Sequence, residues 1–432
     1  MPGKCRDRLE QALTRIADPL GEGGRACPTV YADAARVAAD AADARARLGM
    51  ALGPLDGAIL TIKDLFDVAG EPTRAGSKVL AEEAAPAASD APAIRRLRQA
   101  GGVIVAKTNM SEFAFSGIGA NPHLGTPGNP ADRARVPGGS TSGGAVAVAD
   151  AMCEIAIGSD TGGSTRIPAA LCGVVGYKPS RQRIPTQGAF PLSYTLDSIG
   201  PLARSVADCA AADAVMAGVE PLPLEPAPLA GLRCALASGW PMRDLDVTVS
   251  KRFPEALDRL TGAGVRLATV DLPMLDAMVE VNRKGGVVPC EAYAIHRERL
   301  ARRAGDIDSN VRLRIERGGQ VSAAGYIEML RERAELARAM DARLADFDAL
   351  VMPTVPIVAP LIEEVATPAG FTTKNTLLLR NTAIANFFDL CAVSLPLRQE
   401  GELPIGFMVV ARNGHDRRLF RIAAAFEQAF AS

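Results

Sequence analysis

Apolar positions recur along this chain with two periods, one typical of helices and the other of strands. Residues 4–17 and 31–48 place apolar side chains at helical spacing among charges, which predicts two helices that each pack one face on a core. Short apolar runs at 57–64 and 102–110 have the length of buried strands, and a helical pattern at 90–101 lies between them. This alternation predicts an α/β fold with a parallel or mixed sheet and helices on its faces.

The second half of the chain continues the alternation. Residues 180–203 show no period and predict a loop, which a helix follows from about 204. The proline-rich stretch 221–229 predicts an internal seam. A long charged helical region is expected over 290–345, with its Arg and Glu side chains on solvated faces and in pairs four residues apart. Further strand and helix patterns are at 231–239, 246–263, 265–273, 348–360, 375–397 and 403–430.

Length and charge narrow the class of protein. With 432 residues the chain has room for one large domain or two ordinary ones. The 48 Lys and Arg residues nearly balance the 49 Asp and Glu residues, so neither nucleic acid nor an anionic membrane surface is an expected partner. No uncharged apolar run reaches about 18 residues, and residues 1–20 carry charges where a signal peptide needs an apolar segment. We therefore expect a cytoplasmic protein without a membrane span.

The eight cysteines are scattered singly, with no C-x-x-C pair and no histidine at the spacing of a metal ligand. This distribution predicts buried free thiols in a reducing compartment. It gives no support to a structural metal, and we expect neither a metal nor an organic cofactor.

The most distinctive stretch holds two serine clusters flanked by glycine, GGSTSGG at 138–144 and GSDTGGST at 158–165. Ser140 and Ser164 are 164 − 140 = 24 positions apart, which allows one helix out of the first loop and one strand into the second, so that both loops meet at one end of a sheet. Glycines let backbone N–H groups of the second loop converge, the arrangement that stabilises an oxyanion. Flexible linkers are disfavoured because an apolar segment joins the clusters, and a phosphate loop because Ser164 stands where that motif needs lysine.

Lys63 is the second chemical feature, because it closes the apolar strand predicted at 57–64. Burial without a counter-charge disfavours the ammonium form and lowers the pKa of a lysine, so Lys63 could act as a base. The alternative is a lysine whose stem packs on the sheet while its head reaches water. Lys107 also follows an apolar run, and we interpret it as structural.

Most familiar catalytic motifs are absent. The chain has neither G-x-S-x-G nor S-x-x-K, and none of His123, His296 and His415 adjoins a serine cluster. The segment Gly117-Ile118-Gly119 begins like a dinucleotide fingerprint, but Pro122 occupies the place of its third glycine. What remains is a serine in a glycine nest, a second serine loop and a candidate buried lysine, which together indicate a proton relay without histidine.

The segments PGGSTSGG, GSDTGGSTRIPAALCGVVGYKPS and GAILTIKD resemble the amidase signature family, whose members hydrolyse amide bonds with a Ser-cisSer-Lys triad. The resemblance is highly specific over 57–205, the signature core, and is looser but traceable at VMPTVPIVAP, VSLPL and LPIGFMVVARNG. It implies one α/β domain over 1–432, with a mixed multi-stranded sheet covered by helices on both faces.

The resemblance also implies roles for single residues. Ser164 would be the nucleophile that forms the acyl-enzyme, Ser140 the bridging serine and Lys63 the general base that later returns the proton. The Gly139–Ser140 peptide bond is implied to be cis. The oxyanion hole would consist of the main-chain N–H groups of Thr161, Gly162, Gly163 and Ser164.

Residues around this centre carry weaker expectations. Asp160 and Arg166 flank the nucleophile loop with opposite charges, and we predict that they pair to brace it; the alternative is that Arg166 binds a carboxylate of the substrate. Ser142 departs from the family pattern, so its part in the relay is left open. Positions expected to line the substrate pocket are Ala114, Ser116 and Gly139. Specificity is expected in the loops 110–126 and 183–197 and in the variable region 290–380.

These observations predict an enzyme that hydrolyses amide-type C–N bonds other than peptide bonds through an acyl-enzyme. Its substrate would be a small amide or carbamate. One alternative is an amidotransferase A-type subunit that needs a partner, and another is a scaffold subunit without turnover, although Lys63, Ser140 and Ser164 are all present. Assembly as a homodimer is left open.

Overall fold

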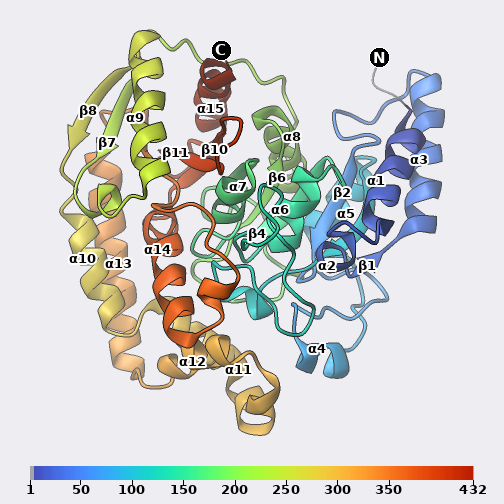
Figure 1. The fold of residues 1–432 in the computed structure, drawn as a ribbon, viewed down its shortest axis with the longest axis horizontal. Helices are drawn as coiled ribbons and strands as arrows, with labels where there is room; N and C mark the ends of the chain where they lie inside the picture. The colour runs from blue at the N-terminus through green and yellow to red at the C-terminus, as the bar shows by residue number, and fades with distance from the viewer. Residues whose placement is uncertain (1–3, 432) are drawn as a thin grey trace.

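A single mixed sheet of eleven strands runs through the middle of the molecule in the computed structural model, which describes residues 4–431 (Figure 1). Its strands lie in the order β1-β3-β2-β4-β6-β5-β10-β11-β9-β7-β8. The pairs β2–β3, β2–β4, β7–β8 and β7–β9 are parallel, and the other neighbours are antiparallel. The strands are β1 Thr29–Val30, β2 Ile59–Lys63, β3 Val103–Thr108, β4 Ile155–Ser159, β5 Val175–Lys178, β6 Ile199–Ala203, β7 Arg233–Ala237, β8 Arg266–Val270, β9 Ala349–Pro353, β10 Cys391–Leu397 and β11 Ile405–Ala411.

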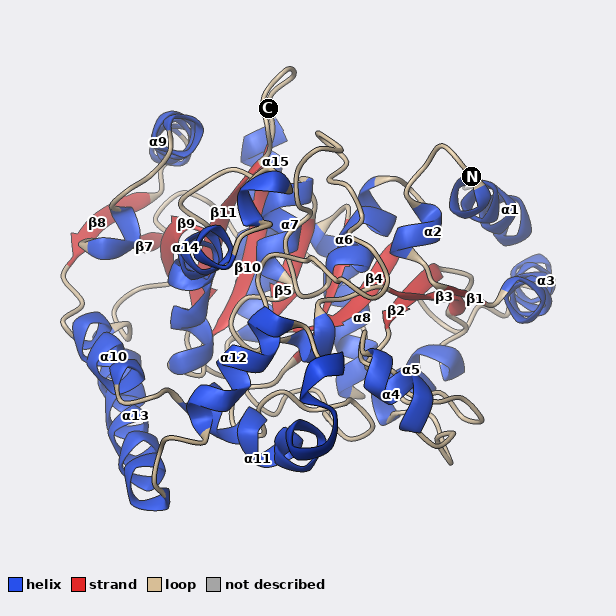
Figure 2. Ribbon diagram, turned by 60° about the horizontal axis from the view of Figure 1, so that its bottom comes forward, coloured by secondary structure: helices blue, strands red, loops and turns tan. Residues whose placement is uncertain are grey.

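Helices lie on both faces of the sheet (Figure 2). In β4, Ile155 and Ile157 enter the core shared with α5 and α8, whereas Ala156 enters the core shared with α1, α3 and α6. This alternation follows from the two-residue period of a strand buried on both faces. The helices are α1 Cys5–Ala17, α2 Gly23–Ala26, α3 Ala32–Arg47, α4 Lys78–Glu83, α5 Pro92–Gln99, α6 Ser142–Ala149, α7 Arg166–Cys172, α8 Val206–Ala217, α9 Val247–Gly262, α10 Met274–Arg283, α11 Val287–Arg303, α12 Ser309–Gly318, α13 Ala323–Arg343, α14 Pro368–Phe387 and α15 Asp416–Ala431.

The structure confirms the predicted fold class, a single domain with a mixed sheet between helices, and most of its predicted elements. The helices α1 and α3 and the strands β2 and β3 lie where the periodicity places them. The proline-rich segment 221–229 is a loop, and the strands β7 and β8 beyond it join the same sheet.

One sequence interpretation of the fold is corrected. The stretch before residue 204 is not all loop, because β6 lies inside the sheet between β4 and β5. The sequence pattern does not reveal this strand, because it contains Gly200 and Pro201 and both residue types are uncommon inside strands. The charged region 290–345 is helical as predicted, and it is divided into three helices because the side chains of Asp308 and Ser322 cap new helix starts at α12 and α13.

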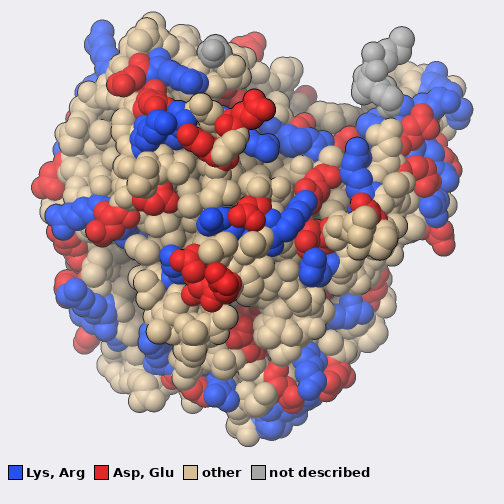
Figure 3. Space-filling model, viewed as in Figure 1, with Lys and Arg blue, Asp and Glu red and all other residues tan. Residues whose placement is uncertain are grey.

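The surface and the cysteines agree with the composition. Basic and acidic side chains are interspersed over the face drawn in Figure 3, as the near-zero net charge suggests. All eight cysteines are free thiols as predicted, and each is buried except the half-buried Cys290. Within residues 4–431, no helix is both long and apolar enough to cross a membrane.

Candidate active site

The two serine-rich loops meet at the edge of the sheet where β2 and β4 end. These strands are parallel neighbours, so their carboxyl ends share one edge, with Lys63 closing β2 and Ser159 closing β4. The helix and strand expected between the loops are α6 and β4. The Thr141 N–H donates to the Ser164 carbonyl at 3.2 Å, which joins the first loop to the second. The geometry expected from the 24-residue gap is therefore present.

Lys63 is fully buried at this edge, and its Nζ lies 2.8 Å from Ser140 Oγ and 2.9 Å from Ser159 Oγ. Burial lowers the pKa of its ammonium group to about 7, although Asp160 and Asp197 favour the charged form. A large share of the side chain is therefore a neutral amine near neutral pH. The alternative in which the head of Lys63 reaches water is wrong, because the residue has no exposed surface.

Ser159 is a partner of Lys63 that the sequence reasoning missed. The signal was available, because Ser159 ends its strand beside the Ser164 loop just as Lys63 ends the neighbouring strand. Ser140, the other partner, follows a cis peptide bond with Gly139, as the family resemblance implies. A Cβ on Gly139 would lie 2.6 Å from the backbone nitrogen of Gly119, so this position has room only for glycine.

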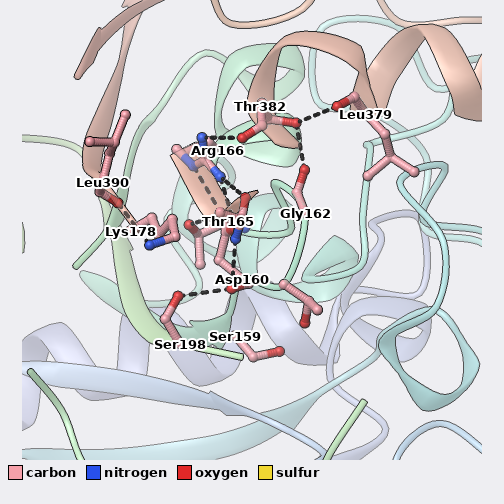
Figure 4. Close-up of polar contacts among 12 residues, drawn as sticks. Ser159, Asp160, Gly162, Thr165, Arg166, Lys178, Ser198, Leu379, Thr382 and Leu390 are labelled. Atoms are coloured by element: carbon pink, nitrogen blue, oxygen red, sulfur yellow. Dashed lines mark hydrogen bonds and ion pairs between the residues drawn. The ribbon is translucent and has the colours of Figure 1, made fainter. Parts of the chain in front are cut away.

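Ser164 lies at the end of a glycine turn and is nearly buried, with 4% of its surface exposed. Gly163 has φ +137, and a Cβ there would lie 2.2 Å from Thr382 Oγ1. The Thr382 hydroxyl donates to the Gly162 carbonyl at 2.7 Å, which fixes the turn against α14 (Figure 4). Both observations explain why this turn requires glycine.

Asp160 and Arg166 form the predicted ion pair beneath the turn, at 2.9 Å and with both side chains fully buried. Arg166 also donates to the Thr382 carbonyl at 2.9 Å (Figure 4). It donates to Asn386 Oδ1 at 2.7 Å as well. Although burial alone would raise it, the charge and hydrogen bonds of Arg166 and the amide of Asn386 hold the pKa of Asp160 well below its usual range. Arg166 is turned into this network, so the alternative in which it binds a substrate carboxylate has no support in the structure.

The segment predicted to form the oxyanion hole is also tied to the loop before β6. Thr161 Oγ1 donates to Asp197 Oδ1 at 2.5 Å, and the backbone N–H groups of Leu192 and Ser193 donate to the other oxygen of the same carboxylate. Burial raises the pKa of Asp197 to about 6 against the opposing effect of these hydrogen bonds. This carboxylate holds two sides of the site together.

A cavity of about 250 Å³ opens beside Ser164. Ala114 and Ser116 line it, as predicted, whereas Gly139 is not among its lining residues. Most of the wall is apolar. The remaining lining residues are Phe115, Thr161, Gly162, Leu192, Leu196, Met278, Asn282, Val288, Pro289, Arg314, Leu379, Ala383, Asn386 and Phe387.

The cavity wall contains residues that the sequence reasoning did not single out. Met278, Asn282 and Phe387 lie outside the regions in which specificity was expected. Arg314 lies inside 290–345, but the solvated-face interpretation of that region is wrong for it, because it lines the cavity. Helical spacing alone cannot identify such residues, because it does not show which face of a distant helix reaches the site.

Two further predicted residues lie apart from the serine–lysine centre. Ser142 begins α6, and its hydroxyl makes a long hydrogen bond of 3.5 Å to the Asn109 carbonyl. Lys107 is buried on β3 with its Nζ 3.6 Å from Asp64, as a structural lysine would be. Among the described residues, no three or more His, Cys, Asp or Glu side chains gather where they could hold a metal ion.

Comparisons with known proteins agree with this geometry. A family model described as Amidase matches residues 9–420. A 2-amino-5-chloromuconic acid deaminase of Comamonas testosteroni is 37% identical over 402 residues, which cover 91% of this chain and 86% of the relative. The A-type subunit of a glutamyl-tRNA(Gln) amidotransferase from Anaeromyxobacter sp. (strain K) is 34% identical over 456 residues, which cover 97% of this chain and 92% of that protein.

The fold agrees with solved structures as well. A crystal structure of an amidase superposes with a TM-score of 0.87 at 33% sequence identity, covering 98% of this chain and 96% of the other. At this identity and coverage, the likeness extends over the whole sheet and its helices.

Proposed function

We propose that this chain, which belongs to the Amidase family of hydrolases acting on C–N bonds, cleaves the amide-type bond of a small molecule through a covalent acyl-serine intermediate. The observation that carries the proposal is the buried Lys63, whose Nζ lies 2.8 Å from Ser140 at the edge that also holds the Ser164 loop. A lysine whose pKa is lowered to about 7 can serve as a base at neutral pH.

In the first half-reaction, Ser164 Oγ attacks the carbonyl carbon of the substrate. The Ser164 proton passes to Ser140 Oγ as the Ser140 proton passes to Lys63 Nζ. The carbonyl oxygen becomes an oxyanion, which the N–H groups of Thr161, Gly162, Gly163 and Ser164 stabilise. When the C–N bond breaks, the proton returns from Lys63 through Ser140 to the leaving nitrogen, and the acyl group stays on Ser164.

In the second half-reaction, water attacks the acyl carbon and gives one proton to the same relay. The ester bond to Ser164 breaks, the carboxylic acid leaves and the proton returns to the Ser164 oxygen. The enzyme is regenerated, and the net change is hydrolysis of one C–N bond without any oxidant or reductant.

Several residues would act by holding these groups in place. The buried pair of Asp160 and Arg166 braces the turn that carries Ser164, and Ser159 fixes the head of Lys63 from its second side. Asp197 orients the segment of Thr161. Such support is what keeps donors aimed at a developing charge.

A second candidate is an amidotransferase A-type subunit, which the match to the amidotransferase relative over 97% of this chain favours. Such a protein would need a partner for its reaction. Hydrolysis of amides or carbamates by the purified chain alone, without a partner or nucleotide, would decide for the first proposal. The retained serines and lysine speak against a scaffold role without turnover.

The test is intact-protein mass spectrometry after treatment with a fluorophosphonate that reacts with activated serines. We expect one adduct on the wild type, none on Ser164→Ala and a much slower reaction on Lys63→Ala. The exposed Ser89 provides a matched control, since Ser89→Ala should label like the wild type. An unlabelled wild type, or an unchanged adduct on Ser164→Ala, would overturn the proposal.

A further inference from the structure

Arg314 differs from the other arginines of its region. It lies on α12, which packs against α11, and it lines the same cavity as Ser164. Its guanidinium carbon lies 4.4 Å from the centre of the Phe115 ring. Within residues 4–431 its guanidinium has no hydrogen bond and no ion pair, and its Nε is buried without a partner.

Two other arginines of this region are paired with acids. Arg303 lies 2.8 Å from Asp306, and Arg312 lies 3.7 Å from Glu316 on the same helix as Arg314. Among the described residues, no acidic side chain lines the cavity. Burial first, and then the like charge of Arg317, lower the pKa of Arg314 to about 10, which leaves it protonated at neutral pH. The described lining of the cavity therefore has one positive charge, that of Arg314, and no acidic group that offsets it.

Such an arrangement is costly unless a ligand offsets it. Arg314 is half-buried and its Nε is buried without a partner, so part of its hydration is lost and nothing in the described protein replaces it. A guanidinium presents its N–H donors in a planar fork, which matches the two oxygens of a carboxylate. The Phe115 ring covers one face of the Arg314 guanidinium, so a polar partner would approach the N–H groups along the edge of the guanidinium.

We propose that Arg314 binds a carboxylate of the substrate, so that the molecule cleaved at Ser164 is an amide-type compound bearing a carboxylate at its other end. This rests on the proposed function for the position of the scissile bond. Between the two polar ends the substrate crosses an apolar wall, whose side chains include Leu192, Met278 and Leu379. At about 250 Å³ the cavity lies just below the roughly 300–1,000 Å³ of common ligand pockets, so the connecting segment is short.

The test measures binding of ligands that have no C–N bond to cleave, so its result is independent of turnover. Keto acids of three chain lengths (levulinate, 5-oxohexanoate and 6-oxoheptanoate) are compared by calorimetry with the matching methyl ketones (2-pentanone, 2-hexanone and 2-heptanone). The proteins are the wild type, Arg314→Met, Arg314→Lys and Arg317→Met. Arg317 is exposed on the same helix, so its variant removes an equal charge outside the cavity.

We expect at least one keto acid to bind the wild type about ten- to a hundredfold more tightly than its ketone, the range of a charge-assisted hydrogen bond. Arg314→Met should lose this preference, Arg314→Lys should keep part of it, and Arg317→Met should keep all of it. Equal binding of acid and ketone, no binding of any acid, or a preference that survives in Arg314→Met would each overturn the assignment. Fluorophosphonate labelling reports separately on Ser164, so failure of the proposed function is distinguishable from failure of the carboxylate site.

Discussion

The reactivity of Ser164 should follow the titration of Lys63. In the proposed relay only the neutral amine of Lys63 can accept the proton from Ser140, and burial lowers the pKa of Lys63 to about 7. Above about pH 7 most Lys63 side chains are neutral and can act as the base, whereas below about pH 7 the ammonium form predominates. The rate of fluorophosphonate labelling should therefore rise with pH through about 7 and then level off.

The size of the effect of burial follows from the shift of the Lys63 pKa from the ordinary lysine value of 10.5 to about 7. An exposed lysine would be neutral in about one molecule in three thousand at pH 7, whereas Lys63 is neutral in about half. Burial thus raises the fraction of Lys63 that is neutral at pH 7 by about a thousandfold. From about pH 7 down to about pH 5, labelling should slow by about fiftyfold in all, and the slope should approach a factor of ten per pH unit at the lower end.

The assay is the second-order labelling rate across pH on the wild type and Asp197→Asn. Because the Asp197 carboxylate raises the pKa of Lys63, its neutralisation should move the acid limb to lower pH. A rate that does not change between about pH 5 and 9, or one that still climbs steeply at about pH 9, would refute the role given to Lys63.

Lys63→Met provides the control for a purely structural role. Because the pKa of Lys63 is lower in the folded protein than in the unfolded chain, the unfolded state binds more protons, and the lysine weakens the fold increasingly as pH falls toward about 7. Lys63→Met should therefore label far more slowly, yet unfold at about pH 6 at the wild-type temperature or higher. A large loss of thermal stability would indicate a structural lysine instead.

Two further predictions concern the residues that hold Ser164, the proposed nucleophile, in place. Gly163→Ala places a Cβ 2.2 Å from Thr382 Oγ1. Because this should misplace a donor of the proposed oxyanion hole, we expect the labelling rate measured by stopped flow to fall by about 10²–10³. A rate within about twofold of the wild type would contradict this prediction. Asp160→Asn leaves the Arg166 charge buried without its partner and should destabilise the protein by about 3–5 kcal/mol in denaturant unfolding. The matched control Glu280→Gln, in an exposed ion pair, should change stability by less than about 1 kcal/mol, and equal effects of the two would contradict the reasoning.

Much of the fold was predictable because it depends on local pattern. The amphipathic helices α1 and α3 and the buried strand β2 have periods that a short window reveals. The strand β6 was not predictable in this way, since Gly200 and Pro201 argue against a strand and only pairing with β4 and β5 on either side keeps it in the sheet.

The sequence by itself determined which chemical groups are available. The glycine-flanked serines, their spacing of 24 residues and a lysine at the end of an apolar run are local features, and they indicated a serine–lysine relay without any structure. The pairing of Asp160 with Arg166 could be predicted for the same reason, because the two residues flank one short loop.

Only the tertiary structure decided how these groups behave. The pKa of Lys63 depends on complete burial among β2, β4 and the serine loops, and the second contact from Ser159 arises because two strands end at one edge. Arg314 reaches the cavity from a helix 150 positions beyond Ser164 (314 − 164 = 150), and no local pattern distinguishes it from its solvated neighbours. Burial and the distances between charges that are far apart in the sequence depend on how the whole chain packs. They therefore cannot be predicted from a short stretch of sequence.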